Sequence, residues 1–157
     1  LYTPGFDAIF IPGRAADAGI ITAQLNFHDM KVPFLGANGW NSPDFARTAD
    51  SSIDGAVFVD GFFVDSPTPV VHDFVERYRK RFQTNPTLFA MQGYDAAKLV
   101  IDAVHTGAST GEAVQEQLLN KPDLSSLNGP AAFEQDGTLN RPLFLIQIKR
   151  GRFVQVN

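Results

Sequence analysis

The residues best suited to chemistry in this sequence are polar and aromatic groups that follow short apolar runs. Arg14 comes directly after Pro12-Gly13 at the end of such a run, where a guanidinium can clamp a carboxylate or another anion. Asn38 and Trp40 share a glycine-flanked loop after the next run, where an amide offers donors and an acceptor and an indole ring can wall an apolar ligand surface. These residue types favour reversible binding of a small molecule. The alternatives are a salt bridge or plain solvation for Arg14, and a cover over the sheet edge for Trp40.

Other patterns that could support catalysis or metal binding are incomplete. His72 and Glu76 share a helix face at a spacing of four, which suits a metal ion, but a third ligand is not evident. Asp60 and Asp65 could form a carboxylate pair, and a surface loop explains them equally well. The sequence has no cysteine, and no serine or glycine-rich loop fits a nucleophile or phosphate motif. We therefore expect no enzyme activity, no metal site and no cofactor.

Strands and helices alternate in the first third of the chain and place Arg14 and Asn38 in loops that follow strands. The run Ala8 to Ile11 is typical of a strand buried on both faces. Apolar runs and helical patterns then alternate over 8–11, 15–28, 32–35, 42–49 and 56–59. The first of these helices carries its apolar residues at Ile20, Ile21, Ala23, Leu25 and Phe27. Such an order predicts a parallel sheet whose loops converge at the carboxyl ends of the strands.

A proline-rich stretch, Asp65 to Pro69, separates this region from a mainly helical one. Helices are expected over 70–82, 87–106 and 109–120. The second of them has a wide apolar surface, so we expect it to be largely buried. A strand over 129–133 and a hairpin of 142–149 with 152–156 complete the pattern. The hairpin turns at Arg150-Gly151, where arginine fits poorly if a two-residue primed turn requires positive φ.

The composition is that of a globular protein rather than a disordered one. The chain has 157 residues, of which 44% are hydrophobic and 19% charged. Its net charge of −4 gives no support for nucleic acid or an anionic membrane as a partner. No stretch approaches the roughly 20 apolar residues of a membrane span. Because the sequence begins with Leu1 rather than methionine, we expect a processed or truncated product.

Five segments carry a family resemblance across essentially the whole chain: FDAIFIPGRAADAGIITAQL, VPFLGANGWNSPDF, DGAVFVDGFF, FVERYRKRFQTNPTLFAMQGYDAAKLVIDAV and GPAAFEQDGTLNRPLFLIQIKRGRFVQV. Their order and spacing resemble the C-terminal half of type I periplasmic solute-binding proteins, in particular the branched-chain amino-acid (Leu/Ile/Val) receptors of ABC importers. The resemblance implies partial α/β lobes of Rossmann-like type, with parallel sheets and a C-terminal β-hairpin. It implies a second-lobe segment over 1–65, a mainly helical return to the first lobe over 66–137, and a hairpin that returns to the second lobe over 138–157.

The function that this resemblance implies is binding without catalysis. Such a protein lies in the periplasm or outside the cell, in some cases lipid-anchored, and binds an amino acid or similar small polar metabolite reversibly between its two lobes. It then delivers this ligand to the membrane permease of an ABC importer. The alternative is a regulatory or sensor module, such as an activator of penicillin-binding proteins.

The ligand-binding residues that the resemblance and the loop positions imply are Arg14, Asn38, Trp40, Phe62, Gln92 and Tyr94. Asn38 departs from the family pattern, because relatives often carry at this place an acidic residue that pairs with the ligand's ammonium group. Two partial lobes would also expose apolar surface, for example at Phe89, Met91 and Tyr94. We therefore expect either a proteolytic remnant or a dimer or swapped assembly that hides this surface.

Overall fold

The computed structural model describes residues 5–42, 45 and 53–156, and the chain divides into two compact units. Unit 1 comprises residues 1–60 and 144–157, and unit 2 comprises residues 61–143. The sequence suggested divisions after Asp65 and after Gly137. Strand pairing explains where the units divide, because Asp60 and Phe144 are the last paired residues of two adjacent strands in unit 1.

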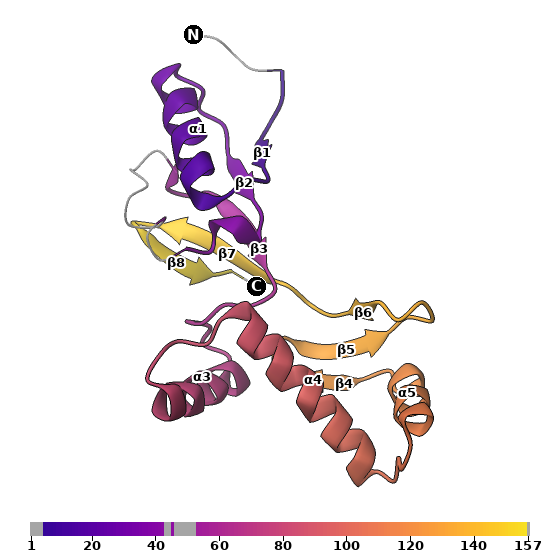
Figure 1. Ribbon diagram of the computed structural model, residues 1–157. Helices are drawn as coiled ribbons and strands as arrows, with labels where there is room; N and C mark the ends of the chain where they lie inside the picture. Colours follow the sequence, from indigo (N-terminus) through magenta and orange to yellow (C-terminus); the bar gives the residue numbers. More distant parts are fainter. Residues whose placement is uncertain (1–4, 43–44, 46–52, 157) are drawn as a thin grey trace. The chain divides into compact units, whose positions relative to one another are not determined.

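Unit 1 contains a five-stranded sheet in the order β1-β2-β3-β7-β8 (Figure 1). Its strands are β1 (Ile9–Ile11), β2 (Phe34–Gly36), β3 (Val57–Asp60), β7 (Phe144–Lys149) and β8 (Arg152–Gln155). The first three strands are parallel, β7 is antiparallel to β3, and β8 is antiparallel to β7. Ile11 pairs with Gly36 and Gly36 with Phe58, so the parallel strands end at one edge. The predicted α/β fold with a C-terminal hairpin is confirmed.

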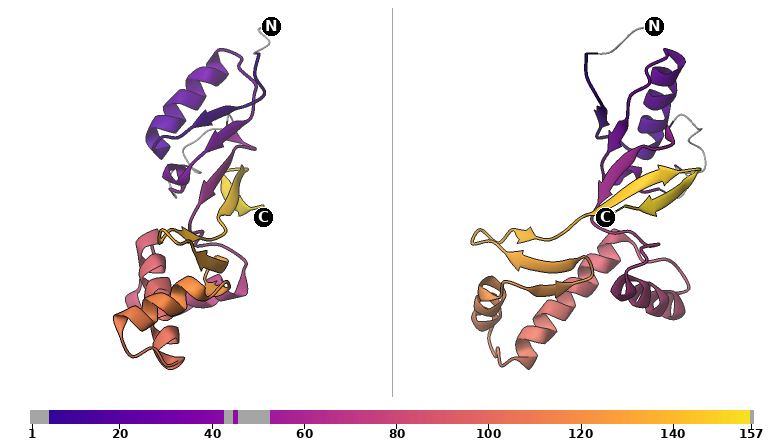
Figure 2. Two further views of the ribbon diagram at one scale, coloured as in Figure 1. Left: turned by 90° about the vertical axis from the view of Figure 1, so that its right-hand side faces the viewer. Right: turned by 180° about the vertical axis from the view of Figure 1, so that it is seen from behind.

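Helix α1 (Ala15–Phe27) lies along one face of this sheet (Figure 2). Its buried residues are Ala18 and Thr22, and the Thr22 hydroxyl donates to the Ala18 carbonyl at 2.8 Å. The predicted apolar face of this helix is wrong, because Ile20 is 66% and Phe27 82% exposed. Small side chains face the core instead and allow the helix to pack closely. A Cβ added to Gly19 would lie only 3.7 Å from the Phe45 ring.

The opposite face of the sheet is largely apolar and exposed, with Gln147, Lys149 and Arg152 as its polar members. Side chains alternate across strands, so this face carries every second strand residue. Its apolar members are Phe10, Leu35, Val57, Val59, Leu145 and Val154. The prediction that the first strand is buried on both faces is therefore wrong: within the described residues, no helix lies against the Phe10 side. The helix predicted over 42–49 lies outside the described residues except for Ser42 and Phe45.

The C-terminal hairpin turns through two residues with positive φ. Arg150 has a φ of 51° and Gly151 a φ of 70°, which is the primed turn that suits a two-residue hairpin. Arginine is an unusual residue in this conformation. The backbone N–H of Arg150 donates to the Asp54 carboxylate, and this bond fixes the turn against the segment that leads into β3.

Unit 2 is mainly helical, with a small antiparallel sheet (Figure 1). Its elements are α3 (Pro69–Phe82), α4 (Leu88–His105), α5 (Gly111–Asn120), β4 (Leu124–Ser126), β5 (Gly129–Phe133) and β6 (Leu139–Asn140). The Thr87 and Thr110 hydroxyls cap α4 and α5 by accepting from Ala90 N–H and Ala113 N–H. Among the helices of the described residues, none has the length and apolarity that a bilayer crossing requires.

A buried carboxylate and a half-buried amide hold unit 2 together around the turn between β4 and β5. The Asp95 carboxylate, on α4, accepts the Leu127 N–H at 3.1 and 3.3 Å and lies 3.7 Å from the Arg141 guanidinium. Asn128, which follows Leu127 in this turn, donates from Nδ2 to the carbonyls of Gly61 at 2.7 Å and Pro142 at 3.0 Å. One amide thus joins the first and last segments of unit 2.

Helix α4 is buried on one side only. Met91, Asp95, Leu99 and Ala103 form its inner side, whereas Phe89 is 80% exposed. The expectation of a largely buried helix is therefore wrong for its outer side. The expected exposure is found at Phe89 but not at Met91, which is fully buried, and Tyr94 is half-buried.

The Asp95 carboxylate makes stability depend on pH. Burial raises the pKa of Asp95 above its ordinary value of 3.8. As the pH rises through this ordinary value, the Asp95 carboxyl of the unfolded chain loses its proton first. The free energy of unfolding therefore falls until the Asp95 carboxyl of the folded chain also ionises. Asp95→Asn abolishes this titration but keeps an oxygen for Leu127 N–H. Urea unfolding of both forms over this range should show the parent losing stability relative to Asp95→Asn, and a difference independent of pH would contradict the assignment.

Candidate functional site

The loops that follow β1 and β2 touch through two glycines at the carboxyl edge of the unit 1 sheet. A Cβ added to Gly39 would lie 2.5 Å from the Gly13 carbonyl oxygen and 3.4 Å from Arg14 Cα. Gly39 belongs to the single-turn helix η1 (Asn38–Trp40) that follows β2. The contact brings Arg14 and Asn38 into neighbouring loops, as the parallel sheet predicted. The glycine pair itself was missed, although the sequence shows a glycine after each strand.

The Trp40 ring supports this edge from inside. It is fully buried and packs on the rings of Phe45 at 5.3 Å and Phe58 at 6.3 Å between centroids. A Cβ on Gly36 would lie only 2.3 Å from the indole, so the ring rests on the bare backbone of β2. Of the two roles considered for Trp40, this geometry fits the cover over the sheet rather than an exposed ligand wall. Its buried Nε1 has no acceptor among the described residues.

Asp60 and Asn41 form a polar pair at the same edge. Asp60 is the last residue of β3 and is buried, and its Oδ2 accepts from Asn41 Nδ2 at 2.6 Å. The bond ties the loop after η1 to the end of the third parallel strand. Asp60 had been considered only as a partner of Asp65, which is an exposed residue of unit 2 that lies 4.0 Å from Arg79. The sequence signal that was available is that Asn41 and Asp60 each come after an apolar run predicted to be a strand of one parallel sheet.

Arg14 and Asn38 are the polar side chains that this edge presents to solvent. The Arg14 side chain is 86% exposed, and its Nε donates to Asp17 Oδ2 at 3.0 Å. Arg14 is also the N-cap residue of α1, and it makes no side-chain cap bond. The first turn of α1 thus offers uncapped backbone N–H groups beside the guanidinium, and the Asp17 carboxylate in the same turn offsets part of their positive charge. The Asn38 side chain is exposed beside them.

The three predicted residues in unit 2 differ in exposure. Phe62 is buried, and its ring meets that of Phe74 edge-on at 6.1 Å. Tyr94 is half-buried on Phe74, and its hydroxyl accepts from Arg77 at 3.2 Å, a bond that raises the pKa of the guanidinium. Gln92 is exposed and lines an open pocket of about 350 Å³, whose other lining residues are Asp95, Ala96, Leu99, Phe133, Leu139 and Arg141.

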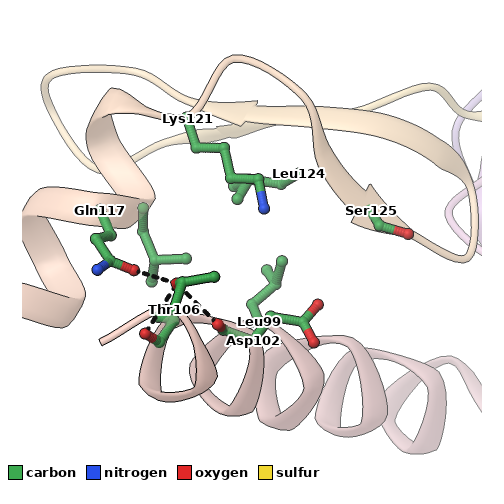
Figure 3. Close-up of a pocket in the computed structure, with 9 residues that line it drawn as sticks. Leu99, Asp102, Thr106, Gln117, Lys121, Leu124 and Ser125 are labelled. Atoms are coloured by element: carbon green, nitrogen blue, oxygen red, sulfur yellow. Dashed lines mark hydrogen bonds between the residues drawn. The ribbon is translucent and has the colours of Figure 1, made fainter. Parts of the chain in front are cut away.

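A second hollow of unit 2, between α4, α5 and β4, is too small for a metabolite (Figure 3). Its volume is about 20 Å³, which suits a single water molecule. Thr106 closes one side, because its hydroxyl bonds to the Gln117 side chain at 2.8 Å and to the carbonyls of Asp102 and Ala103. This hollow has a structural rather than a ligand-binding character.

The glycine contact gives a direct test of how the edge is built. Gly39→Ala should lower the free energy of unfolding by about 1–3 kcal/mol, because its methyl group meets the backbone of Gly13, which cannot move aside as a flexible side chain can. Gly13→Ala is the matched control in the facing loop, since its Cβ would meet only Asp17 Cβ at 3.8 Å. Urea unfolding should separate the two variants, and equal losses would show that the loops do not meet as described.

Comparison with known proteins agrees with this architecture. A family model described as periplasmic binding protein matches residues 6–152. The Leu/Ile/Val-binding protein homolog 3 of Brucella melitensis is 20% identical over 92% of this chain and 39% of its own length. A branched-chain amino acid ABC transporter structure from Rhodospirillum rubrum matches at a TM-score of 0.89, with 24% identity over 96% of this chain and 44% of the other.

A further solved structure was determined with a ligand. It is an ABC transporter substrate-binding protein from Desulfitobacterium hafniense in complex with Leu, with a TM-score of 0.71 and 26% identity over 97% of this chain and 44% of that one. The present chain thus spans less than half the length of these relatives. Because the family model covers nearly all of its residues, the chain belongs to the periplasmic binding protein family.

Proposed function

We propose that this chain is part of an extracytoplasmic solute-binding component of an ABC importer and binds an amino acid or a similar small polar metabolite reversibly. The observation that carries the proposal is the carboxyl edge of the unit 1 sheet, where the loops after β1 and β2 meet at Gly13 and Gly39. Ligands of open parallel sheets bind at this edge. Delivery of the ligand to a membrane permease belongs to the same proposal and is supported by the family.

Arg14 is the proposed partner of the ligand's acidic group. One nitrogen of its guanidinium is bonded to Asp17, and the rest of this largely exposed group is available for a carboxylate. The start of α1 adds backbone N–H groups with the partial positive charge of the helix dipole. Together they favour a ligand that carries a carboxylate or a comparable anion.

Asn38 is the proposed second contact, and its chemistry bears on selectivity. An amide can accept from an ammonium group or donate to an oxygen, but it cannot supply the charge of a carboxylate. We infer that ammonium recognition by Asn38 is weaker than it would be with an acidic residue. The ligand class therefore extends from amino acids to small acids, in line with the solute binding protein of Rhodopseudomonas palustris whose structure contains benzoate.

The remaining predicted residues have different parts in this proposal. Trp40 and Phe62 are buried, so we assign them to support rather than to ligand contact. Gln92 is exposed on a pocket of unit 2 and stays a proposed contact residue. Tyr94 also stays a proposed contact residue through its ring edge, since its hydroxyl is already bonded to Arg77.

A titration followed by amide NMR tests this site and tolerates weak binding. The twenty amino acids and benzoate are added in turn to the isotope-labelled chain. A ligand should shift the signals of Gly13, Arg14 and Asn38 most. Arg14→Gln should weaken binding about tenfold or more, because it removes charge-assisted hydrogen bonds worth roughly 1.5–3 kcal/mol. Absence of saturable shifts in these loops for every compound would overturn the proposal.

Two variants control this titration. Lys31→Gln removes an exposed cation from the segment that leads into β2, at the other end of the sheet from Arg14, and should leave affinity unchanged. Asn38→Asp keeps the size of the side chain and adds a negative charge. It should strengthen binding of an amino acid and weaken binding of benzoate, and the same change for both classes would remove Asn38 from the site.

A further inference from the structure

An asparagine followed by a glycine occurs twice in the sequence, at Asn38-Gly39 and at Asn128-Gly129. This dipeptide can rearrange without an enzyme, because glycine has no Cβ that would hinder its backbone nitrogen. The glycine nitrogen attacks the side-chain carbonyl carbon of the asparagine. A new C–N bond forms, the bond from Cγ to Nδ2 breaks, and ammonia leaves with the proton of the glycine nitrogen. The product is a cyclic succinimide.

Water then opens the succinimide at either of its carbonyl carbons. Addition of water at the former side-chain carbon gives an ordinary aspartate. Addition at the main-chain carbon gives an isoaspartate, in which the main chain runs through the former side chain and is one atom longer. Both products carry a carboxylate that is ionised at neutral pH, where the asparagine carried a neutral amide.

The Asn38-Gly39 pair is open to this attack. Both residues are exposed, and within the described residues the Asn38 side chain makes no hydrogen bond. They lie in η1, which is held by Trp40 N–H on the Ala37 carbonyl at 3.0 Å and by Asn41 N–H on the Asn38 carbonyl at 3.1 Å. A single turn of this tight helix has poorer hydrogen-bond geometry than an α-helix and opens locally at small cost. Asn38 can therefore turn its side chain onto the Gly39 nitrogen.

The Asn128-Gly129 pair has the same chemistry but is held in place. The Asn128 Nδ2 donates to the carbonyls of Gly61 at 2.7 Å and Pro142 at 3.0 Å. Gly129 begins β5, where it pairs with Ser126, and its carbonyl accepts from the Ser126 hydroxyl at 2.7 Å. Attack at this pair requires that both hydrogen bonds of the amide break first. Asn128 is therefore a matched control within the same chain.

We propose that Asn38 is a site of spontaneous deamidation, and that its conversion to isoaspartate breaks the contact between the loops after β1 and β2. Gly39 packs on the Gly13 carbonyl without room for a Cβ, which would lie 2.5 Å from that oxygen. A main chain lengthened at the preceding residue cannot keep this fit. Trp40 follows directly and is buried on Gly36, so the same change displaces the only tryptophan of the chain. The inference concerns the covalent chemistry of this edge and makes no assumption about its ligand.

Peptide mass spectrometry during incubation at mildly alkaline pH tests the reaction. The rate of conversion from amide to acid is measured at Asn38 and at Asn128, in the folded chain and in the chain unfolded by urea. The ratio of folded to unfolded rate removes the effect of the neighbouring sequence. Folding should slow Asn128 about tenfold or more, because two hydrogen bonds must break, and should leave Asn38 within about threefold of its unfolded rate. Equal protection of the two asparagines would overturn the proposal.

Tryptophan fluorescence of the same samples tests the structural consequence. As isoaspartate accumulates at position 38, emission should move to longer wavelength, because water reaches a ring that is fully buried in the parent. Asn38→Gln keeps an amide but would have to close a larger ring, so its emission should stay constant over the same incubation. Fresh Asn38→Asp adds the charge without lengthening the main chain, and its emission should match that of the fresh parent. The proposal also fails if emission stays constant while Asn38 converts, or if it moves equally in Asn38→Gln.

Discussion

The absence of two side chains governs how the candidate site is built. Gly36 lets the Trp40 indole rest on the backbone of β2, and Gly39 lets the next turn touch the backbone of Gly13. Either methyl group would force main chain or a buried ring to move, which well-packed interiors resist. The positions of Arg14 and Asn38 therefore follow from sterics at two neighbouring glycines rather than from any attraction between the two polar residues.

Unit 2 is held by polar contacts where unit 1 is held by ring packing. Asp95 fixes the turn between β4 and β5, and the Asn128 amide in that turn bridges Gly61 and Pro142. These two carbonyls belong to the segments by which the chain enters and leaves unit 2. In unit 1 the corresponding segments are paired as β3 and β7, from Asp60 and Phe144 onward. Within each unit the two connecting segments are thus held side by side, by the β3–β7 ladder in unit 1 and by the Asn128 amide in unit 2.

The sequence predicted the elements far better than it predicted which sides of them are covered. The parallel strands, the helix over 109–120 and the C-terminal hairpin follow from local patterns. The direction of the Trp40 ring does not, because a glycine-flanked loop permits an inward and an outward ring equally. The turn at Arg150 also escaped local rules, since its positive φ is supported by Asp54, a residue far away in the sequence. The strand β4 has only three residues, too few for a periodic signal.

The errors on burial have a common physical origin in the alternation of side chains. In β1, Ile11 points into the core and Phe10 points to the open face, although both belong to one apolar run. Periodicity reports that a surface is apolar but not what covers it, so both sides were expected to be buried. The candidate ligand contacts escape this ambiguity, because Arg14 and Asn38 lie in loops at the carboxyl edge and belong to neither face of the sheet.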